Sequence, residues 1–276
     1  MKKVLFFAKN ALKETATVII TLSAFVGIIA IIDLTEILPC VCHRVLVVAV
    51  IFAFSFLVAL AKTSFTKKVD YPLGDGRLET TIKFGDILNT GEGNTIVISV
   101  NEYFDTIVDG EIIAQDSLHG QFVKSIFGGD THTLDKAISS DLKKQGIRPT
   151  INELREKGKQ EKYPIGTIAH VEKNGRTYFL MALTRFSEQN VVIETTLDEY
   201  NLALSALLVH INTYSKGSLV SLPILGAGRT RLGKDKKTIL GHILSTLRMS
   251  RTPIPVKLQI VLEKDDWGKI NLRDYK

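Results

Sequence analysis

Residues 219–230 read LVSLPILGAGRT, an apolar run that passes directly into a glycine-rich turn. Such a run is typical of a buried strand that ends in a loop. In α/β sheets, ligands bind at the carboxyl ends of strands, because the N–H groups of the loops there attract phosphate. Gly226 and Gly228 allow an anion to approach the backbone closely, and Arg229 and Thr230 supply further donors. We therefore expect an anion-binding loop, with a tight surface turn as the alternative.

The elements on either side of this loop alternate between strands and helices, which predicts an α/β fold with a mixed sheet between helices. Asn174 and Gly175 predict a tight hairpin turn, because both residues tolerate positive φ. Thr196 and Glu199 predict a capping box at a helix start. The expected strands are 78–87, 95–100, 165–172, 177–184, 219–224 and 256–262, and the expected helices are 121–127, 132–144, 234–248 and one from 197 until Gly217. That last helix is expected to bury one face, formed by Leu197, Tyr200, Leu204, Leu207, Ile211 and Tyr214.

Two uncharged apolar spans precede this domain, Ala16 to Ile32 and Val45 to Ala61. At ~1.5 Å per helical residue each span covers about 25 Å, and flanking residues can extend it to the thickness of a bilayer. A secretory signal peptide is rejected for the first span, because no small-residue cleavage site follows it and a second span does. We predict a transmembrane hairpin over residues 1–62, a linker over 63–76 and the α/β domain over 77–276.

Basic residues near the ends of the spans predict the orientation of the hairpin, because they resist translocation. The connecting turn offers only Arg44, beside Asp33 and Glu36. The outer ends carry Lys2, Lys3, Lys9 and Lys13 before the first span and Lys62, Lys67 and Lys68 after the second. We expect a multi-pass protein of the cell membrane with both termini and the α/β domain in the cytoplasm.

The net charge of +6 is concentrated in the membrane-proximal part of the chain. Residues 1–68 hold eight Lys or Arg against three Asp or Glu, which accounts for five of the six net charges. Anionic lipid attracts such a segment. The remainder of the chain has no basic stripe interleaved with aromatic residues, so a nucleic-acid partner is not expected.

Two other patterns are excluded on chemical grounds. Residues 228–234 satisfy G-x-x-x-x-G-K, but Asp235 follows where a nucleoside triphosphatase needs a Ser or Thr for Mg²⁺. Cys40 and Cys42 are too close in sequence for an unstrained disulfide within one chain, and they lack the His cluster of a metal site. They are expected to be plain thiols, with a bridge between neighbouring copies as the alternative. We expect neither a metal nor a cofactor.

Three short motifs resemble the landmarks of macro domains, which bind ADP-ribose: Gly85-Asp86-Ile87, the strand that ends in Asn101, and residues 222–230. The resemblance covers residues 78–265. It implies that Asp86 recognises adenine and that Asn101 faces the distal ribose. The loop around the diphosphate is implied to consist of Leu225, Gly226, Ala227, Gly228, Arg229 and Thr230. The alternative interpretation is that Asp86 caps a turn and that Asn101 closes a strand. Asp86, Ile87, Asn101 and the loop residues 225–230 form the expected binding set.

The chain departs from hydrolytic macro domains after Asn101, because residues 109–120 read DGEIIAQDSLHG and lack a run of glycines. We therefore expect no hydrolysis. The stretch Ser117-Leu118-His119-Gly120 is expected to replace that run as a phosphate or ribose contact. A nucleophile and base pair is not expected of Ser117 and His119, because at a spacing of i, i+2 on a strand their side chains point apart and no carboxylate is placed to orient them.

Residues 101–105, NEYFD, together with 117–120 resemble the macro domain of membrane-anchored effectors in Thoeris anti-phage systems. Asp105 joins the expected binding set on this resemblance. In that family a TIR-domain partner consumes NAD and makes an ADP-ribose derivative, in one branch a histidine conjugate. The macro domain senses this derivative, and the effector then damages the membrane of its own cell. We expect such an effector to form a homo-oligomer on activation. The alternatives are a membrane-tethered ADP-ribosyl hydrolase and a passive anchor or scaffold.

Overall fold

The computed structural model describes residues 3–15, 49–50, 53–61, 66–73, 80–89, 95–228, 230, 232–252 and 254–275. The first predicted span lies outside these residues, as does about a third of the second. None of the helices within the described ranges has both the length and the apolar character needed to cross a membrane. The chain divides into two compact units, one of Met1–Val69 with Lys264–Lys276 and one of Asp70–Glu263.

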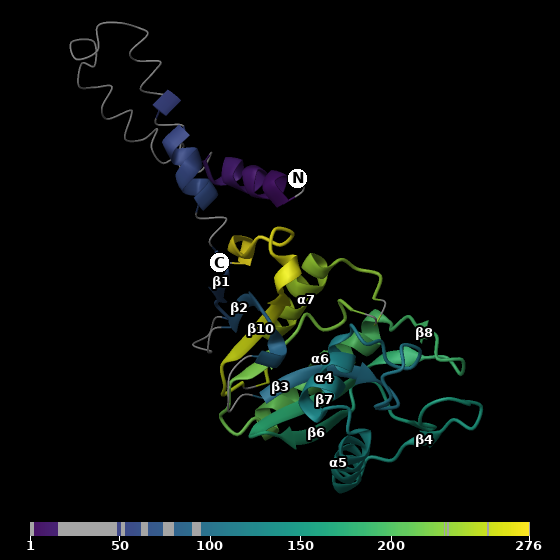
Figure 1. Cartoon of the computed structure of the whole chain (residues 1–276). Coiled ribbons are helices and arrows are strands. Elements are labelled where there is room, and N and C mark those ends of the chain that lie inside the picture. The colour runs from purple at the N-terminus through teal and green to yellow at the C-terminus, as the bar shows by residue number, and fades with distance from the viewer. Residues whose placement is uncertain are drawn as a thin grey trace, which may run out of the picture. The chain divides into compact units, whose positions relative to one another are not determined.

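A mixed sheet forms the centre of the second unit (Figure 1). Its strands follow the order β1-β2-β10-β9-β3-β7-β6, and β8 pairs with β7. The strands β2, β10, β9, β3 and β7 run parallel to one another, whereas β6 and β8 are antiparallel to β7. The bounds are β1 (Lys68–Tyr71), β2 (Thr80–Gly85), β3 (Thr95–Asn101), β6 (Ile168–Lys173), β7 (Arg176–Phe186), β8 (Val192–Ile193), β9 (Val220–Leu222) and β10 (Leu258–Glu263). A separate antiparallel pair joins β4 (Thr150–Ile151) to β5 (Glu161–Lys162).

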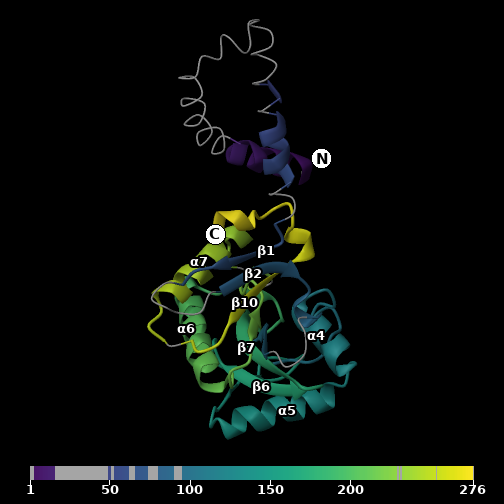
Figure 2. The same cartoon turned by 90° about the vertical axis from the view of Figure 1, so that its left-hand side faces the viewer.

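Helices cover both faces of this sheet, with α6 and α7 on one side and α4 on the other (Figure 2). Their bounds are α4 (Leu118–Phe127), α5 (Thr131–Lys144), α6 (Leu197–Tyr214) and α7 (Lys236–Met249). Short 3₁₀ turns are η1 (Ile87–Asn89), η2 (Lys264–Asp266) and η3 (Leu272–Tyr275). Because both faces are covered, six of the seven residues of the central strand β3 are buried, including the apolar run Ile96–Ile98.

The predicted hairpin and capping box are confirmed. Asn174 and Gly175 connect β6 to β7 with φ of 52° and 69°. Thr196 Oγ1 accepts from the backbone N of Glu199, whose carboxylate accepts from the backbone N of Thr196. The α/β fold with a mixed sheet between helices is therefore as the sequence predicts.

Several element ends differ from the prediction. The expected strand 78–87 is shorter, because Asp86 ends β2 and begins the turn η1. The helix expected from 121 begins at Leu118, because Ser117 caps it. Asp235 caps α7, which starts at Lys236 and not at 234. The predicted face of α6 is buried only in its middle, since Leu197 and Tyr214 lie at the exposed ends of the helix.

Candidate functional site

The parallel strands bring several predicted site residues to one edge of the sheet. The carboxyl ends of β2, β9 and β3 meet at this edge, where they lead into Asp86, into the glycine loop and into the turn after Asn101. We call this edge the carboxyl edge. The strands β10 and β9 separate β2 from β3, so Asp86 and Asn101 lie about 14 Å apart at ~4.8 Å per strand. A ligand that reaches both must be elongated.

The loop after β9 has one glycine that the fold requires and one that it does not. Gly226 has a φ of +85°, and a Cβ there would lie 2.3 Å from Leu232 Cδ1. Leu225 is fully buried, and its carbonyl accepts from the Tyr200 hydroxyl at 2.7 Å, which fixes the start of the loop. Gly228 is exposed, and a Cβ there would meet nothing within 4 Å. The loop is thus rigid at Gly226 and open at Gly228.

The far end of the same loop is tied to β7. Thr230 is buried, and its Oγ1 lies 3.4 Å from Thr184 Oγ1. Thr184 is also the register partner of Asn101 in the pairing of β7 with β3. The glycine loop and the end of β3 are therefore neighbours. Of the remaining predicted loop residues, Ala227 donates its N–H to Ile224, and Arg229 lies outside the described residues.

Asp86 caps η1, as the alternative interpretation of the sequence has it. Its Oδ1 accepts from Leu88 N at 3.0 Å and its Oδ2 from Asn89 Nδ2 at 2.7 Å. The side chain is nevertheless exposed, and each carboxylate oxygen keeps a second lone pair for a donor from outside. Ile87 is buried beneath this turn. A contact of Asp86 with adenine stays a prediction.

Asn101 closes a tight turn at the end of β3. Its Oδ1 accepts from the backbone N–H groups of Tyr103 and Asp105 at 3.1 and 3.2 Å, and its Nδ2 donates to Asp105 Oδ2 at 3.0 Å. One amide hydrogen of Asn101 is left for a further acceptor. Phe104, in the middle of the turn, has a φ of 48°, a conformation that costs a bulky residue about 1–3 kcal/mol. Such strain persists only where the surroundings hold the turn in place.

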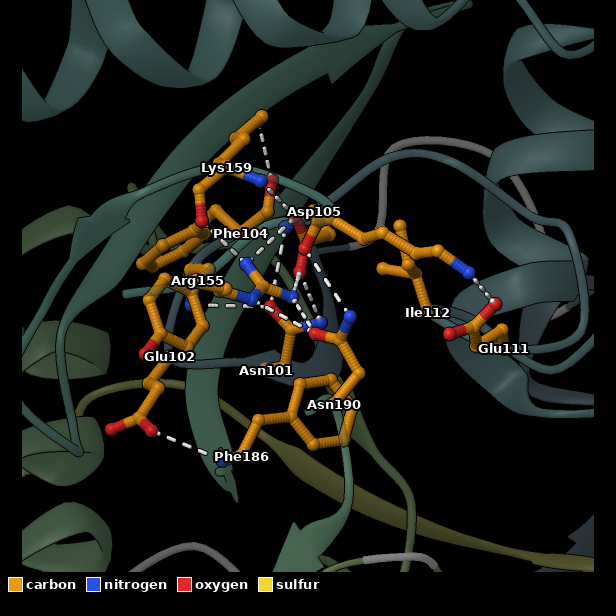
Figure 3. A network of polar contacts seen from close by, with 12 residues as sticks. Asn101, Glu102, Phe104, Asp105, Glu111, Ile112, Arg155, Lys159, Phe186 and Asn190 are labelled. Atoms are coloured by element: carbon orange, nitrogen blue, oxygen red, sulfur yellow. Dashed lines mark hydrogen bonds and ion pairs between the residues drawn. The ribbon is translucent and has the colours of Figure 1, made fainter. Parts of the chain in front are cut away.

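A buried arginine holds this turn from a distant part of the chain (Figure 3). Arg155 follows β4, and its side chain has no solvent exposure. Its Nη2 lies 2.7 Å from Asp105 Oδ2 and 2.6 Å from Asn190 Oδ1, and its Nη1 lies 3.2 Å from Asp105 Oδ1. Its Cζ stacks 3.9 Å from the centre of the Tyr103 ring. The guanidinium group thus joins three segments of the chain.

Asp105 is the acceptor at the centre of this network. Besides Arg155 and Asn101, it accepts from Lys159 N at 2.8 Å. All of these donors belong to the protein, and the side chain is only 1% exposed. The structure therefore gives Asp105 the role of supporting the amide of Asn101, and a direct ligand contact by this carboxylate stays a prediction.

The stretch 117–120 forms the amino end of α4 beside the same turn. Ser117 Oγ accepts from Gly120 N at 3.0 Å and donates to Ala114 O at 2.7 Å. Ser117 and His119 therefore lie at a helix start, and the strand assigned to them from the sequence is wrong. Gly120 is required, since a Cβ there would lie 2.2 Å from Ala114 O. Leu118 is the first helical residue. A helix start with free N–H groups attracts anions.

His119 is buried at this helix start. Burial is the main cause that lowers the pKa of His119, the nearby positive charge of Lys159 lowers it as well, and a hydrogen bond with the backbone of Asp105 opposes both effects, so that the pKa falls from 6.5 to about 3. The ring is therefore neutral at neutral pH. Its bond to the backbone of Asp105 connects α4 to the turn that Asn101 closes.

Comparisons with known proteins show the family of this chain. The family described as Thoeris protein ThsA, Macro domain, matches residues 80–263. The Thoeris protein ThsA of Bacillus amyloliquefaciens (strain Y2) is 34% identical over 206 residues, which cover 72% of this chain and 67% of that protein. The chain belongs to the ThsA macro domain family.

One solved structure supports the macro-domain fold, and a second is a likeness only. A mutant macrodomain of Oceanobacillus iheyensis with ADPR is 14% identical, with a TM-score of 0.51, and covers 75% of this chain and 95% of its own. The macrodomain of Mycobacterium tuberculosis DarG is 16% identical, with a TM-score of 0.43, and covers 66% of this chain and 97% of its own. At such identities the first likeness shows the fold alone.

Within the ThsA macro domain, the structure brings together three of the four predicted segments. The turn after Asn101 adjoins the glycine loop through Thr184 and Thr230, and it adjoins α4 through His119. Asp86 lies farther along the carboxyl edge. Sequence reasoning missed the buried Arg155 and its partner Asn190, because Arg155 stands in the polar run NELREKGKQEK, where an arginine is normally solvated.

Three other histidines, His170, His210 and His242, lie away from this site. His170 pairs in register with Phe179 near the start of β7, away from the carboxyl edge, and its Nε2 contacts His210 Nε2. His242 Nε2 lies 2.6 Å from Asn201 Oδ1. Among the residues that the structure describes, no cluster of three or more His, Cys, Asp or Glu side chains is arranged to hold a metal ion.

Proposed function

We propose that this protein is a membrane-anchored effector of Thoeris defence, and that its macro domain binds an ADP-ribose derivative at the carboxyl edge. The observation that carries the proposal is the glycine loop, fixed at Gly226 and open at Gly228, next to the turn of Asn101 in a member of the ThsA macro domain family. A TIR-domain partner that consumes NAD makes the signal, in one branch a histidine conjugate.

The site residues suggest how such a ligand lies. The exposed carboxylate of Asp86 accepts from the amino group of adenine at one end of the edge. The diphosphate lies against the open backbone at Gly228 and faces the amino end of α4, where N–H groups attract anions. The remaining amide hydrogen of Asn101 donates to a hydroxyl of the distal ribose. The span of about 14 Å between Asp86 and Asn101 is consistent with this order.

We infer that the domain is a receptor and not an enzyme. A hydrolase needs a group that activates water. Asp105 is engaged by Arg155 and Lys159, and His119 is buried and hydrogen-bonded to the backbone of Asp105, so neither side chain is available for that role. Any turnover is expected to be slower than ~0.01 s⁻¹, below the usual range of ~1 to 1,000 s⁻¹. The second candidate function, a membrane-tethered ADP-ribosyl hydrolase, predicts turnover within that usual range.

The output of the effector is proposed to be the membrane. Residues 1–62 form a hairpin with both termini in the cytoplasm, as the two uncharged spans and their flanking lysines suggest. A ligand shifts a membrane state only if it binds the active assembly more tightly than the resting one, by ~1 to 3 kcal/mol per coupled site. Binding is therefore expected to drive homo-oligomerisation, disruption of the membrane and abortive infection.

Calorimetry of the full chain in detergent micelles tests which compound the macro domain binds. The titrants are ADP-ribose, its histidine conjugate, its cyclic forms and NAD, and the ligand is recovered afterwards to measure turnover. Tight binding of one titrant, recovered unchanged, supports a receptor, whereas multiple turnovers support the hydrolase.

Substitution of Gly228 tests the site itself. Gly228→Glu is expected to abolish binding, because its carboxylate repels the diphosphate at close range. Gly228→Ala is the matched control, since its Cβ meets nothing within 4 Å, and it should bind as wild type does. Normal binding by Gly228→Glu would show that the phosphate site lies elsewhere.

A further inference from the structure

The helix of residues 3–15 is held along one side by residues of its own unit. The ring of Phe7 lies 5.5 Å from the ring of Trp267, and Arg273 Nη2 lies 3.0 Å from Glu14 Oε2. Ala11 and Thr15 are buried on this side. Both Trp267 and Arg273 belong to the segment that directly follows β10. The first helix of the chain and its last residues therefore form one packed element.

The opposite side of this helix combines exposed apolar side chains with lysines. Leu5 is 71% exposed and Leu12 is 54% exposed, and Lys9 and Lys13 are also exposed. Their spacing of i, i+4, i+7 and i+8 places all four on one face of a helix. We call these four residues the Leu-Lys face. A helix face that meets only water does not normally expose two leucines in register.

The Leu-Lys face carries positive charge from its two lysines. Glu14 is the only acidic residue among the first 32, and it pairs with Arg273 on the other side of the helix. In the sequence, seventeen uncharged residues, 16–32, follow directly after residue 15. Leucines flanked by lysines, next to an apolar span, match the surface of a bilayer that contains anionic lipid.

We propose that the helix of residues 3–15 lies on the inner surface of the membrane and binds anionic lipid through its Leu-Lys face. This inference rests on the proposed membrane anchor. Leu5 and Leu12 enter the boundary between headgroups and acyl chains, while Lys9 and Lys13 extend to the lipid phosphates. Because the same helix packs on Trp267 and Arg273, it fastens the segment after β10 to the membrane surface. The macro domain is then tethered at both its first and its last strand.

Spin labelling of the full chain tests the depth of this face. In a Cys40→Ser/Cys42→Ser background, a nitroxide is placed by Leu12→Cys, and a matched label by Ser205→Cys on the exposed side of α6. The protein is reconstituted into phosphatidylcholine vesicles with and without phosphatidylglycerol. The label at 12 should collide several-fold more with oxygen, relative to a water-soluble nickel complex, than the label at 205.

Three results would overturn the proposal, and they are distinguishable. If both labels are equally accessible to nickel while the chain sediments with vesicles, the surface helix is absent and the anchor stands. If the chain does not sediment with vesicles, the anchor and the surface helix both fail. If the label at 12 is shielded from nickel and oxygen alike, the Leu-Lys face binds protein and not lipid.

Charge reversal tests the lipid specificity. Lys9→Glu/Lys13→Glu should raise the nickel accessibility of the label at 12 on vesicles that contain phosphatidylglycerol, since each lysine near an anionic surface contributes about fivefold to its binding. Lys136→Glu/Lys144→Glu on α5 reverses two exposed charges of the other unit and should have no effect. Equal accessibility before and after reversal at Lys9 and Lys13 would refute recognition of anionic lipid.

Discussion

Removal of the buried guanidinium of Arg155 should destabilise the macro domain far more than removal of an exposed cation from the same loop. Arg155→Met keeps much of the side-chain volume but leaves Asp105 and Asn190 without their main donor. Breaking a buried ion pair from one side costs about 3–5 kcal/mol, because the remaining charge stays buried and uncompensated. The melting temperature of a domain of this size should fall by about 6–20 °C.

Lys157 provides the matched control for this prediction. Its Nζ lies 2.7 Å from Glu111 Oε2, the same separation as between Arg155 and Asp105, but both side chains are more than half exposed. An exposed pair contributes about 0–1 kcal/mol, so Lys157→Ala should lower the melting temperature by less than about 4 °C. Because both ion pairs have the same separation, the difference between the two melting temperatures measures the effect of burial.

The assay is thermal unfolding of the full chain in detergent micelles, followed by circular dichroism. Asp105→Asn and the double variant Arg155→Met/Asp105→Asn complete a mutant cycle. The double variant should lose clearly less than the sum of the two single losses, since no uncompensated charge remains. If Arg155→Met melts no lower than Lys157→Ala, the network does not hold the turn of Asn101.

Other predictions follow from individual contacts. His119 has a pKa of about 3 in the folded chain, whereas in the unfolded chain it takes up a proton near pH 6.5. Below pH 6.5 the unfolded state therefore binds one proton more than the folded state. His119 should thus lower the free energy of unfolding by up to ~1.4 kcal/mol for each pH unit below 6.5. His119→Gln should flatten that slope in melts between pH 7 and pH 5, and an unchanged slope would assign it to other groups. Thr196→Ala should cost about 1 kcal/mol by loss of the capping box of α6, whereas Thr196→Ser should melt as wild type does. Gly226→Ala should cost about 1–3 kcal/mol because of its φ of +85° and the contact with Leu232, whereas Gly228→Ala should be neutral, and equal melting of the two would contradict this strain.

Local patterns in the sequence predict the elements of the domain well, because their signals depend on neighbours in the chain. The turn at Asn174 and Gly175 follows from the tolerance of both residues for positive φ, and the capping box from the spacing of Thr196 and Glu199. The element ends at Asp86 and Ser117 were missed, because an Asx or Ser side chain that caps a helix looks the same in sequence as one that awaits a ligand.

What the sequence determines by itself is the class of the domain, the order of its motifs and the concentration of its positive charge at the ends of the apolar spans. These depend on composition and on spacing along the chain. The partners of Asn101 and Asp105 are decided only by the tertiary structure, because Arg155 reaches Asp105 across 50 positions of sequence. An arginine in a polar run carries no sign of burial until the fold surrounds it with acceptors. The motifs of the candidate site can therefore be found in the sequence, whereas the buried network that holds the turn of Asn101 in place is visible only in the folded chain.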